Sequence, residues 1–406
     1  MPKKTIRDVE VRDRRILTRV DFNIPIRDGK AADATRIEAA LPTITYILNQ
    51  GGRLILMSHL GRPDGKPNPE FSLKPAALKL AEFLGLPVPL APDCVGPEVG
   101  RMVGEVKPGG VLMLENVRFH PEEELLNKYQ GQDAPTRARI DAFTRELAGF
   151  ADVYVNDAFG AAHRAHASTQ GVAKYIKTKV AGFLMEKEVK YFGEVLANPE
   201  RPFLAILGGA KVSDKVLVID NLLEKVDGLI IGGAMAYTLM KAAGQPVGVS
   251  RVEDDKLEVA GKVFAKAKAG NVKLLLPVDH VCARQFDAKE PDGVFAAIPP
   301  DMMGLDIGPK SRELFKGEIA KAKTIVWNGP MGVFEKPSFA EGTFDVCQAV
   351  ADNSACVSII GGGDSVSAVN KSGLAAKMTH ISTGGGASLE FLEGKVLPGV
   401  AALDDA

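Results

Sequence analysis

The chain has 406 residues, of which 46% are hydrophobic and 25% charged, and its 50 lysines and arginines nearly balance its 51 aspartates and glutamates. This length exceeds one ordinary hydrophobic core, so two domains are expected, and the formal net charge of -1 argues against a protein that works mainly on nucleic acid or acidic membranes. No apolar leader opens the chain and no run approaches the ~18 apolar residues of a membrane span, so we expect a soluble, cytoplasmic protein.

Short apolar runs recur in the first half of the chain and are separated by stretches with helical periodicity. These runs are Ile16–Phe22, Arg53–Ser58, Val111–Leu114 and Ala151–Val155. Apolar runs without alternation are typical of strands buried on both faces, as in a parallel sheet covered by helices. The pattern predicts a first α/β domain over residues 1–175.

A single helix is predicted next, over Gly182–Ala197. Its apolar residues Met185, Val189, Phe192 and Leu196 are spaced by 4, 3 and 4 positions and share one face of a helix. We interpret this segment as the helix that joins two domains, although periodicity alone also allows an ordinary surface helix.

The second half of the chain repeats the same rhythm. Its apolar runs are Phe203–Leu207, Leu229–Ile231, Leu274–Val278, Thr324–Trp327, Cys356–Ile360 and Met378–Ser382. They predict a second α/β domain over residues 198–388. The fold class is therefore α/β, with two doubly wound, Rossmann-like parallel-sheet domains.

The residues that follow the first-half strands are polar and often basic, and ligands of open parallel sheets bind at this carboxyl edge. The candidates are Asp21, Asn23, Arg36, His59, Arg62, Arg118, His163, Arg164 and His166. Guanidinium groups bind phosphate and carboxylate bidentately, so several together predict a site for a small, multiply anionic metabolite. Any one of these residues alone could be a surface charge or a turn residue, and the histidines favour anion contact over metal binding.

Glycines follow the second-half strands instead, at 208–209, 232–233, 361–363 and 384–386. They let a ligand approach the backbone, and helix-starting N–H groups favour phosphate, although turn glycines are common for other reasons. No Walker A motif occurs, and no convincing GxGxxG follows a strand, which weakens the alternative of a nicotinamide dehydrogenase. Asp364, in the GGGDS segment, could hold a Mg²⁺ ion that bridges nucleotide phosphates.

The four cysteines lie far apart in the sequence. Cys94, Cys282, Cys347 and Cys356 show no CxxC spacing, which favours buried free thiols over a zinc site or a disulfide framework.

Taken together, these segments resemble phosphoglycerate kinase, and the match runs in order over nearly the whole chain. The matching stretches are RVDFNIP from Arg19, SHLGRP from Ser58, LENVRF from Leu114, NDAFGAAHRAHAST from Asn156, LGGAKVSDK from Leu207, GLDIGP from Gly304, WNGPMGVFE from Trp327, GGGDS from Gly361 and STGGGASLEFLEGKVLP from Ser382. Departures are modest: Ile24 stands where Val is usual, Ser365 where Thr is common, and Ala234 where a third Gly is frequent. The segment Asn127–Thr136 looks longer than usual, and we expect an exposed loop there.

The resemblance implies two domains facing each other across a cleft, with residues 389–406 packing back on the first domain. It implies that 3-phosphoglycerate or 1,3-bisphosphoglycerate is held by Asp21, Phe22, Asn23, Arg36, His59, Leu60, Gly61, Arg62, Arg118 and Arg164. It implies that ATP or ADP is held by Lys215, Gly233, Gly304, Glu335, Gly362, Gly363, Asp364 and Ser365. Asp364 would bind the Mg²⁺ of MgATP or MgADP, and a monomer without nucleic-acid or membrane partners is expected.

The implied reaction transfers a phosphoryl group between ATP and a carboxylate. A carboxylate is already ionised near neutral pH, so no general base is needed and the difficulty is the crowding of negative charge. The residues expected to offset that charge are Arg36, Lys211 and the backbone amides of Gly363 and Gly386. A non-catalytic binding protein with the same fold is the remaining alternative, and it predicts damage at such positions, which this sequence does not show.

Overall fold

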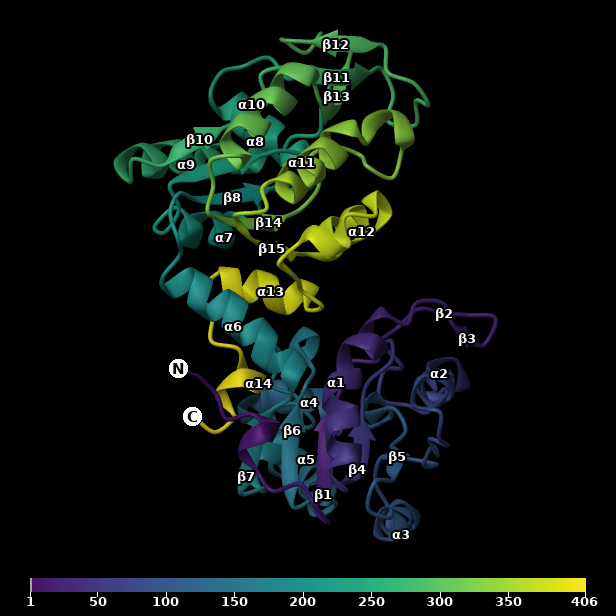
Figure 1. Cartoon of the computed structure of the whole chain (residues 1–406). Helices are drawn as coiled ribbons and strands as arrows, with labels where there is room; N and C mark the ends of the chain where they lie inside the picture. The colour runs from purple at the N-terminus through teal and green to yellow at the C-terminus, as the bar shows by residue number, and fades with distance from the viewer. Residues whose placement is uncertain (1) are drawn as a thin grey trace. The chain divides into compact units, whose positions relative to one another are not determined.

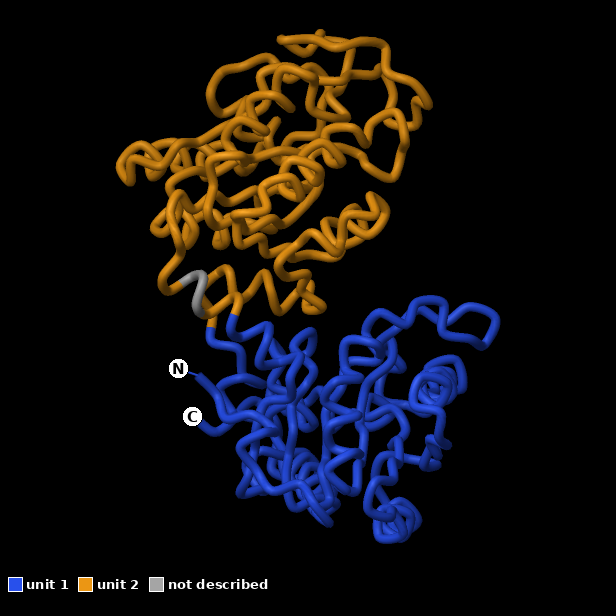
Figure 2. The backbone as a smooth tube through the Cα atoms, in the orientation of Figure 1, with its two compact units in different colours: residues 1–190, 396–406 blue, residues 191–395 orange. Residues whose placement is uncertain are grey.

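The computed structural model describes residues 2–406, apart from the side chains of residues 194–196, and it divides into two compact units (Figure 1, Figure 2). Unit 1 comprises Met1–Lys190 with Val396–Ala406, and unit 2 comprises Tyr191–Lys395. The returning segment is therefore shorter than the expected 389–406. Residues up to 395 stay with unit 2 because α13 (Gly385–Leu392) packs on α7 (Val216–Leu222), where the Asn221 side-chain amide donates to the Leu392 carbonyl at 2.6 Å.

Unit 1 is built on a five-stranded parallel sheet in the order β5-β4-β1-β6-β7. The strands are β1 (Arg15–Arg19), β4 (Arg53–Met57), β5 (Val111–Met113), β6 (Val153–Asn156) and β7 (Thr178–Ala181). The helices are α1 (Thr35–Asn49), α2 (Lys74–Leu84), α3 (Pro97–Glu105), α4 (Glu122–Leu125), α5 (Ala134–Gly149) and α14 (Pro398–Ala401). The chain winds outward from β1 through β4 to β5, then returns to β6 on the other side of β1. This doubly wound order confirms the expected fold class, and it places a reversal of strand order between β1 and β6.

Several short elements of unit 1 were not predicted from the sequence. The two-residue strands β2 (Ile26–Arg27) and β3 (Lys30–Ala31) form a hairpin, and they are too short and too polar to give a pattern. Asn127–Thr136 is not a loop: it contains most of a 3₁₀-helix, Leu126–Gly131, and the first turn of α5. The Asp133 carboxylate caps that turn by accepting from the Thr136 amide at 2.8 Å.

The predicted helix at the middle of the chain is present as α6 (Phe183–Ala197), and the division between the two units falls within it. Met185 and Phe192 are buried as its periodicity predicts, whereas the Leu196 side chain lies outside the described residues. The first turn is held by Asp157, whose Oδ1 accepts from the amides of Leu184 at 2.9 Å and Met185 at 3.1 Å. Asp157 follows β6 directly, so one buried carboxylate joins the sheet of unit 1 to the start of α6.

Substitution Asp157→Ala is expected to lower the free energy of unfolding by about 1–3 kcal/mol, because it leaves buried helix-start amides without acceptors. Urea denaturation followed by circular dichroism measures this loss. Glu186→Ala is the matched control on the same helix: its carboxylate pairs with Arg7 at 2.7 Å on the surface, where a loss of about 1 kcal/mol or less is expected. Equal effects of the two substitutions would contradict the capping role of Asp157.

Unit 2 repeats the plan with a six-stranded parallel sheet in the order β10-β9-β8-β14-β15-β16. Its strands are β8 (Phe203–Leu207), β9 (Gly228–Ile231), β10 (Lys273–Leu275), β14 (Thr324–Asn328), β15 (Val357–Gly361) and β16 (His380–Ile381). A separate antiparallel sheet contains β11 (His280–Ala283), β12 (Gly293–Phe295) and β13 (Met303–Ile307). The remaining helices are α8 (Ala234–Ala242), α9 (Leu257–Ala269), α10 (Pro309–Ile319), α11 (Glu341–Asp352) and α12 (Gly363–Ser372). Here the strand order reverses between β8 and β14.

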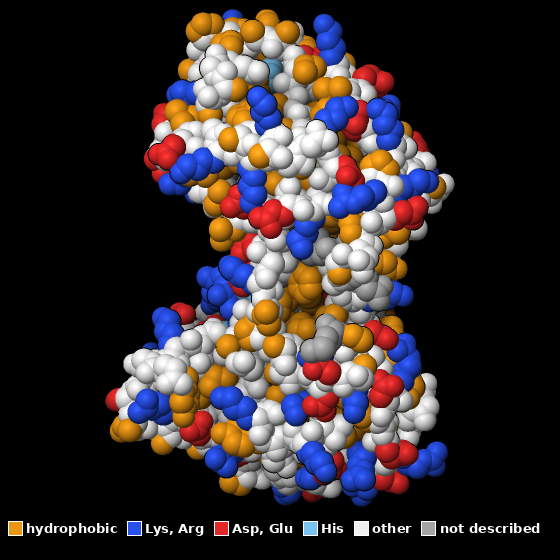
Figure 3. Space-filling view, turned by 90° about the vertical axis from the view of Figure 1, so that its left-hand side faces the viewer, with side chains coloured by type: hydrophobic (Ala, Val, Ile, Leu, Met, Phe, Trp, Pro, Cys, Tyr) orange, Lys and Arg blue, Asp and Glu red, His pale blue; other side chains and the backbone are white. Residues whose placement is uncertain are grey.

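Apolar side chains fill the interior of both units, and charged side chains of both signs lie on the surface. Both parallel sheets carry buried apolar side chains on both faces, and Trp327 of β14 is fully buried. Figure 3 shows Lys and Arg side chains interspersed with Asp and Glu on the face that it draws. Among the described residues, no helix combines the length and the apolar character that crossing a membrane requires.

Candidate functional site

A pocket of about 280 Å³ opens in unit 1 at the carboxyl ends of β1, β4 and β6. Its lining consists of Asp21, Asn23, Arg36, His59, Gly61, Arg62, Arg118, Gly160, Ala161, His163, Arg164 and His166. Eight of the ten residues expected to hold the phosphoglycerate are in this set. The other two, Phe22 and Leu60, have their side chains in the hydrophobic core, so only their backbones remain near the pocket. Gly160 and Ala161 line it without having been predicted.

The loops around the pocket fix one another. Arg36 donates through Nη1 to Asp21 Oδ1 at 3.1 Å and to the Asn23 carbonyl at 2.9 Å. The Asn23 side-chain oxygen in turn accepts from the Gly61 amide at 2.9 Å. Arg118 donates to the Gly61 carbonyl at 2.8 Å. The strand-end residues are therefore preorganised by contacts between three different loops.

Positive charge dominates this pocket. Four of its lining side chains are arginines, Arg36, Arg62, Arg118 and Arg164, whereas Asp21 is its single lining carboxylate. Burial lowers the pKa of the Arg118 guanidinium, but it stays protonated at any physiological pH. An anion with more than one negative charge is the ligand that such a set of donors favours.

The protonation of His59 is decided by the buried Arg19 behind it. The Arg19 Nη2 lies 3.1 Å from His59 Nδ1. A guanidinium only donates hydrogen bonds, so Nδ1 must accept and the ring proton must sit on Nε2. Burial and then the charge of Arg19 hold the pKa of His59 well below its usual value. His59 therefore offers a ligand an N–H donor while remaining neutral.

Arg19 also belongs to a buried polar network that the sequence analysis missed. Its Nε donates to Ser168 Oγ at 2.7 Å, and that hydroxyl donates to Glu123 Oε1 at 2.6 Å. Glu123 is fully buried and lies 3.6 Å from Nδ1 of the pocket residue His166. Arg19 and Glu123 of this network therefore contact two histidines of the pocket, His59 and His166. Arg19, a charged residue at the end of a buried strand, was the available signal.

In unit 2 a lysine occupies the point where strand order reverses. The Lys215 Nζ donates to the Gly208 carbonyl at 2.6 Å, and to the Asn328 carbonyl at 2.8 Å and side-chain oxygen at 2.7 Å. Gly208 follows β8 and Asn328 ends β14, so this ammonium group joins the two central strands. Burial lowers the pKa of Lys215 to about 8. A positive charge is therefore held at the carboxyl edge of this sheet, as a phosphate site requires.

Two helices of unit 2 begin side by side near this edge. α12 begins at Gly363 and α13 at Gly385, and a Cβ placed on Gly385 would lie 3.6 Å from the Gly363 amide nitrogen. Ser365 is buried, and its Oγ accepts from the Gly329 amide at 2.5 Å, which ties α12 to the end of β14. Gly386 and Asp364 lie exposed in the first turns of their helices. Unpaired N–H groups of two helix starts make this a natural anion site.

The other residues predicted to act in unit 2 are Gly233, Gly304, Glu335 and Lys211. Gly233 has a φ of +67° and lies so close to Gly209 that a Cβ would come within 2.6 Å of its backbone. Gly304 lies against the hydroxyl of Tyr237, a residue of α8, which begins directly after Gly233. Glu335 and Lys211 are both exposed. The glycines are thus required by close packing, whereas Glu335 and Lys211 stand open to solvent.

Comparison with known proteins agrees with this arrangement. A family model described as phosphoglycerate kinase matches residues 6–395. The chain is 54% identical over 410 residues to the phosphoglycerate kinase of Chloroherpeton thalassium and 55% identical over 407 residues to that of Moorella thermoacetica, with 100% of each chain covered.

Two solved structures share the fold. The phosphoglycerate kinase from Coxiella burnetii superposes with a TM-score of 0.88 at 39% identity, and that from Pyrococcus horikoshii with 0.83 at 31%, each covering 99% of this chain and 98% of the other. The arginine-lined pocket, the two doubly wound units and these matches along the full length lead to one conclusion. The chain belongs to the phosphoglycerate kinase family.

Proposed function

We propose that this kinase catalyses the glycolytic transfer of a phosphoryl group between ATP and the carboxylate of 3-phosphoglycerate, giving ADP and 1,3-bisphosphoglycerate. The observation that carries the proposal is the unit 1 pocket, in which four arginines surround a space of about 280 Å³. A small metabolite with a phosphate and a carboxylate matches both the charge and the size of this pocket.

We assign the phosphoglycerate to unit 1 and the nucleotide to unit 2. Asp21, Asn23, His59, Gly61, Arg62, Arg118 and Arg164 would hold the phosphoglycerate, with the backbones of Phe22 and Leu60 beside them. Lys215, Gly362, Gly363 and Ser365 would hold the nucleotide phosphates, and Gly233, Gly304 and Glu335 the nucleoside. The support for the second set is the lysine at the β8–β14 reversal and the paired starts of α12 and α13.

The reaction step follows from the charges that it brings together. Arg36 from unit 1 and Lys211 from unit 2, with the amides of Gly363 and Gly386, would neutralise the transferring phosphoryl group. Because the two ligands are assigned to different units, transfer in line requires the units to close around them and to exclude water. The ionised carboxylate is the nucleophile, so the side chains position and neutralise without removing a proton.

Asp364 is the proposed magnesium ligand, with Mg²⁺ entering as MgATP or MgADP. Its exposed carboxylate stands in the first turn of α12 and acts electrostatically on the pKa of Lys215, so it is near the proposed phosphate site. A single carboxylate together with phosphate oxygens is a donor set that suits Mg²⁺. The ion would neutralise charge on the β- and γ-phosphate oxygens.

Asp364→Ala is expected to weaken MgATP binding at least about tenfold and to leave the affinity for 3-phosphoglycerate nearly unchanged, since one charged contact of this kind contributes roughly 1.4 kcal/mol or more. Isothermal titration with each ligand separately measures both. Asp345→Ala, which removes another carboxylate from the neighbouring helix α11, serves as the control and should change neither affinity. Equal weakening of both ligands by Asp364→Ala would contradict the division of the site.

The kcat/KM for ATP should fall as pH rises above about 8, where free Lys215 loses its proton and with it an ion pair to the phosphates. The sign follows from the lowered pKa: the ammonium form predominates below pH 8, is half populated at about pH 8 and disappears above it. Steady-state kinetics from pH 6.5 to 9.5 test this. The kcat/KM for 3-phosphoglycerate, measured at saturating ATP, should stay flat. A kcat/KM for ATP that stayed constant over this pH range would contradict the proposal that the charge of Lys215 binds the nucleotide phosphates.

A monomeric state and a cytoplasmic location complete the proposal. They rest on the family resemblance and on the balanced charge of the chain, which gives no reason to expect nucleic-acid or membrane partners. The direct test of function is an assay of ATP consumption that depends on 3-phosphoglycerate. A protein that transferred hydride with a nicotinamide cofactor, or that bound both ligands without turnover, would overturn the proposal.

A further inference from the structure

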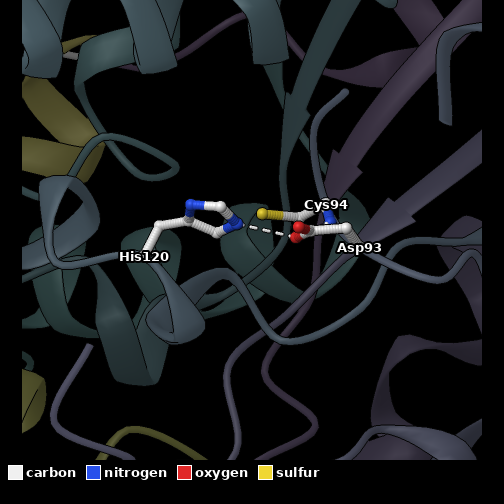
Figure 4. A group of neighbouring side chains, drawn as sticks. All are labelled: Asp93, Cys94 and His120. Atoms are coloured by element: carbon white, nitrogen blue, oxygen red, sulfur yellow. Dashed lines mark hydrogen bonds and ion pairs between the residues drawn. The ribbon is translucent and has the colours of Figure 1, made fainter. Parts of the chain in front are cut away.

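A cluster of three chemically different metal-binding side chains lies in unit 1, outside the arginine-lined pocket. Asp93, Cys94 and His120 each bring one donor atom within 4.8 Å of the other two. The Asp93 Oδ1 and the His120 Nε2 are 2.7 Å apart. Figure 4 shows the carboxylate, the sulfur and the imidazole edge directed toward one another. Oxygen, sulfur and nitrogen thus converge on one point.

The backbone on both sides holds these donors in place. Residues 89–93 extend the sheet along β5: the Ala91 amide donates to the Met113 carbonyl at 2.8 Å, and the Glu115 amide to the Asp93 carbonyl at 3.3 Å. His120 directly follows the short 3₁₀-helix Val117–Phe119, and its ring stacks on Phe143 of α5 with centroids 5.1 Å apart. The cluster is therefore preorganised rather than assembled from mobile chain.

The surroundings are negative and accessible. Three further carboxylates, those of Glu122, Glu123 and Glu146, interact electrostatically with the side chains of this cluster. A bound cation would relieve this accumulated negative charge. The Asp93 and His120 side chains remain 42% and 27% exposed, while Cys94 is fully buried beneath them. An ion can reach the cluster through its exposed side and meet the sulfur below.

We propose that Asp93, Cys94 and His120 form a binding site for a borderline-soft divalent cation of the Zn²⁺ type. Such ions accept sulfur, nitrogen and oxygen ligands in a tetrahedral arrangement, whereas Mg²⁺ and Ca²⁺ require oxygen alone. Three protein ligands would leave the fourth position to water. Zinc–ligand bonds of about 2.0–2.3 Å imply ligand atoms roughly 3.3–3.7 Å apart, so the Asp93–His120 pair must open by about half an ångström.

The site would join the loop before α3 to a segment that lines the pocket. Asp93 and Cys94 lie in the loop before α3, while His120 stands two residues after Arg118, which donates to the Gly61 carbonyl and lines the pocket. An ion at the cluster therefore fixes the segment that carries Arg118. Metal binding should raise the thermal stability of the protein in the absence of any substrate, because the ion binds the folded chain.

The test is a Co²⁺ titration of the full chain after treatment with a chelator and dialysis, without substrates. The expected result is one equivalent of Co²⁺ bound with a thiolate-to-cobalt charge-transfer band in the near ultraviolet, and no displacement by a tenfold excess of Mg²⁺. Cys94→Ser should abolish the band. His120→Gln should weaken Co²⁺ binding by about tenfold or more. Cys356→Ser removes another buried thiol and should leave the band intact.

The result that would overturn the proposal is the absence of a charge-transfer band in the unaltered protein at stoichiometric Co²⁺. A band that survives Cys94→Ser, or binding that His120→Gln leaves unchanged, would also overturn it. His120 is partly exposed, so its substitution is expected to fold even if that of the buried Cys94 does not. The thermal midpoint with and without Co²⁺ gives a readout that is independent of catalysis.

Discussion

Arg36→Ala is expected to lower kcat by roughly 10²–10³, equivalent to about 3–4 kcal/mol of transition-state stabilisation. The reason is that the proposed reaction gathers a carboxylate and a phosphoryl group, and the Arg36 guanidinium is held at the pocket rim by Asp21 and the Asn23 carbonyl. Its charge is thus already in position before the reaction begins. Steady-state kinetics in the direction of ATP consumption, together with a calorimetric measurement of ADP affinity, give the two quantities. ADP affinity should be nearly unchanged.

Arg53→Ala provides a closely matched control for Arg36→Ala. Both side chains are 34% exposed, but Arg53 stands at the amino end of β4, the opposite edge of the same sheet. Its removal should leave kcat within about twofold, as expected for a surface charge away from the site. If Arg36→Ala left kcat unchanged, or lowered it no more than Arg53→Ala, the catalytic assignment of Arg36 would be wrong.

Lys211→Ala should reduce kcat by a similar factor, roughly 10²–10³, with a small effect on stability. Lys211 follows the glycines after β8 and is exposed, so its removal breaks no described packing. In the proposed mechanism its ammonium group offsets charge on the phosphoryl group only during transfer. The effect should therefore appear in kcat rather than in the KM for ATP.

Lys241→Ala is the control that tests whether removing a lysine elsewhere in unit 2 also lowers kcat. Lys241 belongs to α8, and its Nζ forms a surface ion pair with Asp254 Oδ1 at 2.7 Å. Its substitution should not change kcat. A Lys211→Ala enzyme with normal kcat and a raised KM would instead assign Lys211 to nucleotide binding.

Much of the fold could be predicted because buried parallel strands leave a strong signal. Every apolar run in the two halves overlaps a strand or, at Leu274–Val278, begins within one. The edge strand β7 (Thr178–Ala181) escaped because Lys179 interrupts its apolar character. Strands β11 and β13 escaped because the buried polar residues His280 and Asp306 interrupt theirs, and β12 is short and only partly buried. The pattern therefore identified strands with continuous apolar runs and missed strands that are short or interrupted by polar residues.

The pocket was predictable for a topological reason. Parallel strands bring their carboxyl ends to one edge, so residues such as Asp21, His59 and Arg118, far apart in sequence, had to lie near one another. Phe22 and Leu60 are the two predicted residues whose side chains do not line the pocket. They alternate along the chain with pocket residues, so their side chains point into the core.

Contacts that depend on side-chain packing could not be predicted from the sequence. Nothing in the spacing of Asp93 and His120, which are 27 positions apart, indicates that their side chains meet at 2.7 Å. The support of His59 by Arg19 was equally hidden, because a buried arginine is exceptional and its partner lies 40 positions away. Such pairs are fixed by the three-dimensional packing of separate segments rather than by a local motif.

The most direct measurement is a crystal structure of the protein with 3-phosphoglycerate, Mg²⁺ and a non-transferable ATP analogue bound together. In that complex, the Arg36 guanidinium and the Lys211 ammonium should both lie within about 3 Å of oxygens on the reacting carboxylate or the terminal phosphoryl group. If both ligands were bound and the two cations still pointed into separate crevices, charge neutralisation shared by the two units would be refuted.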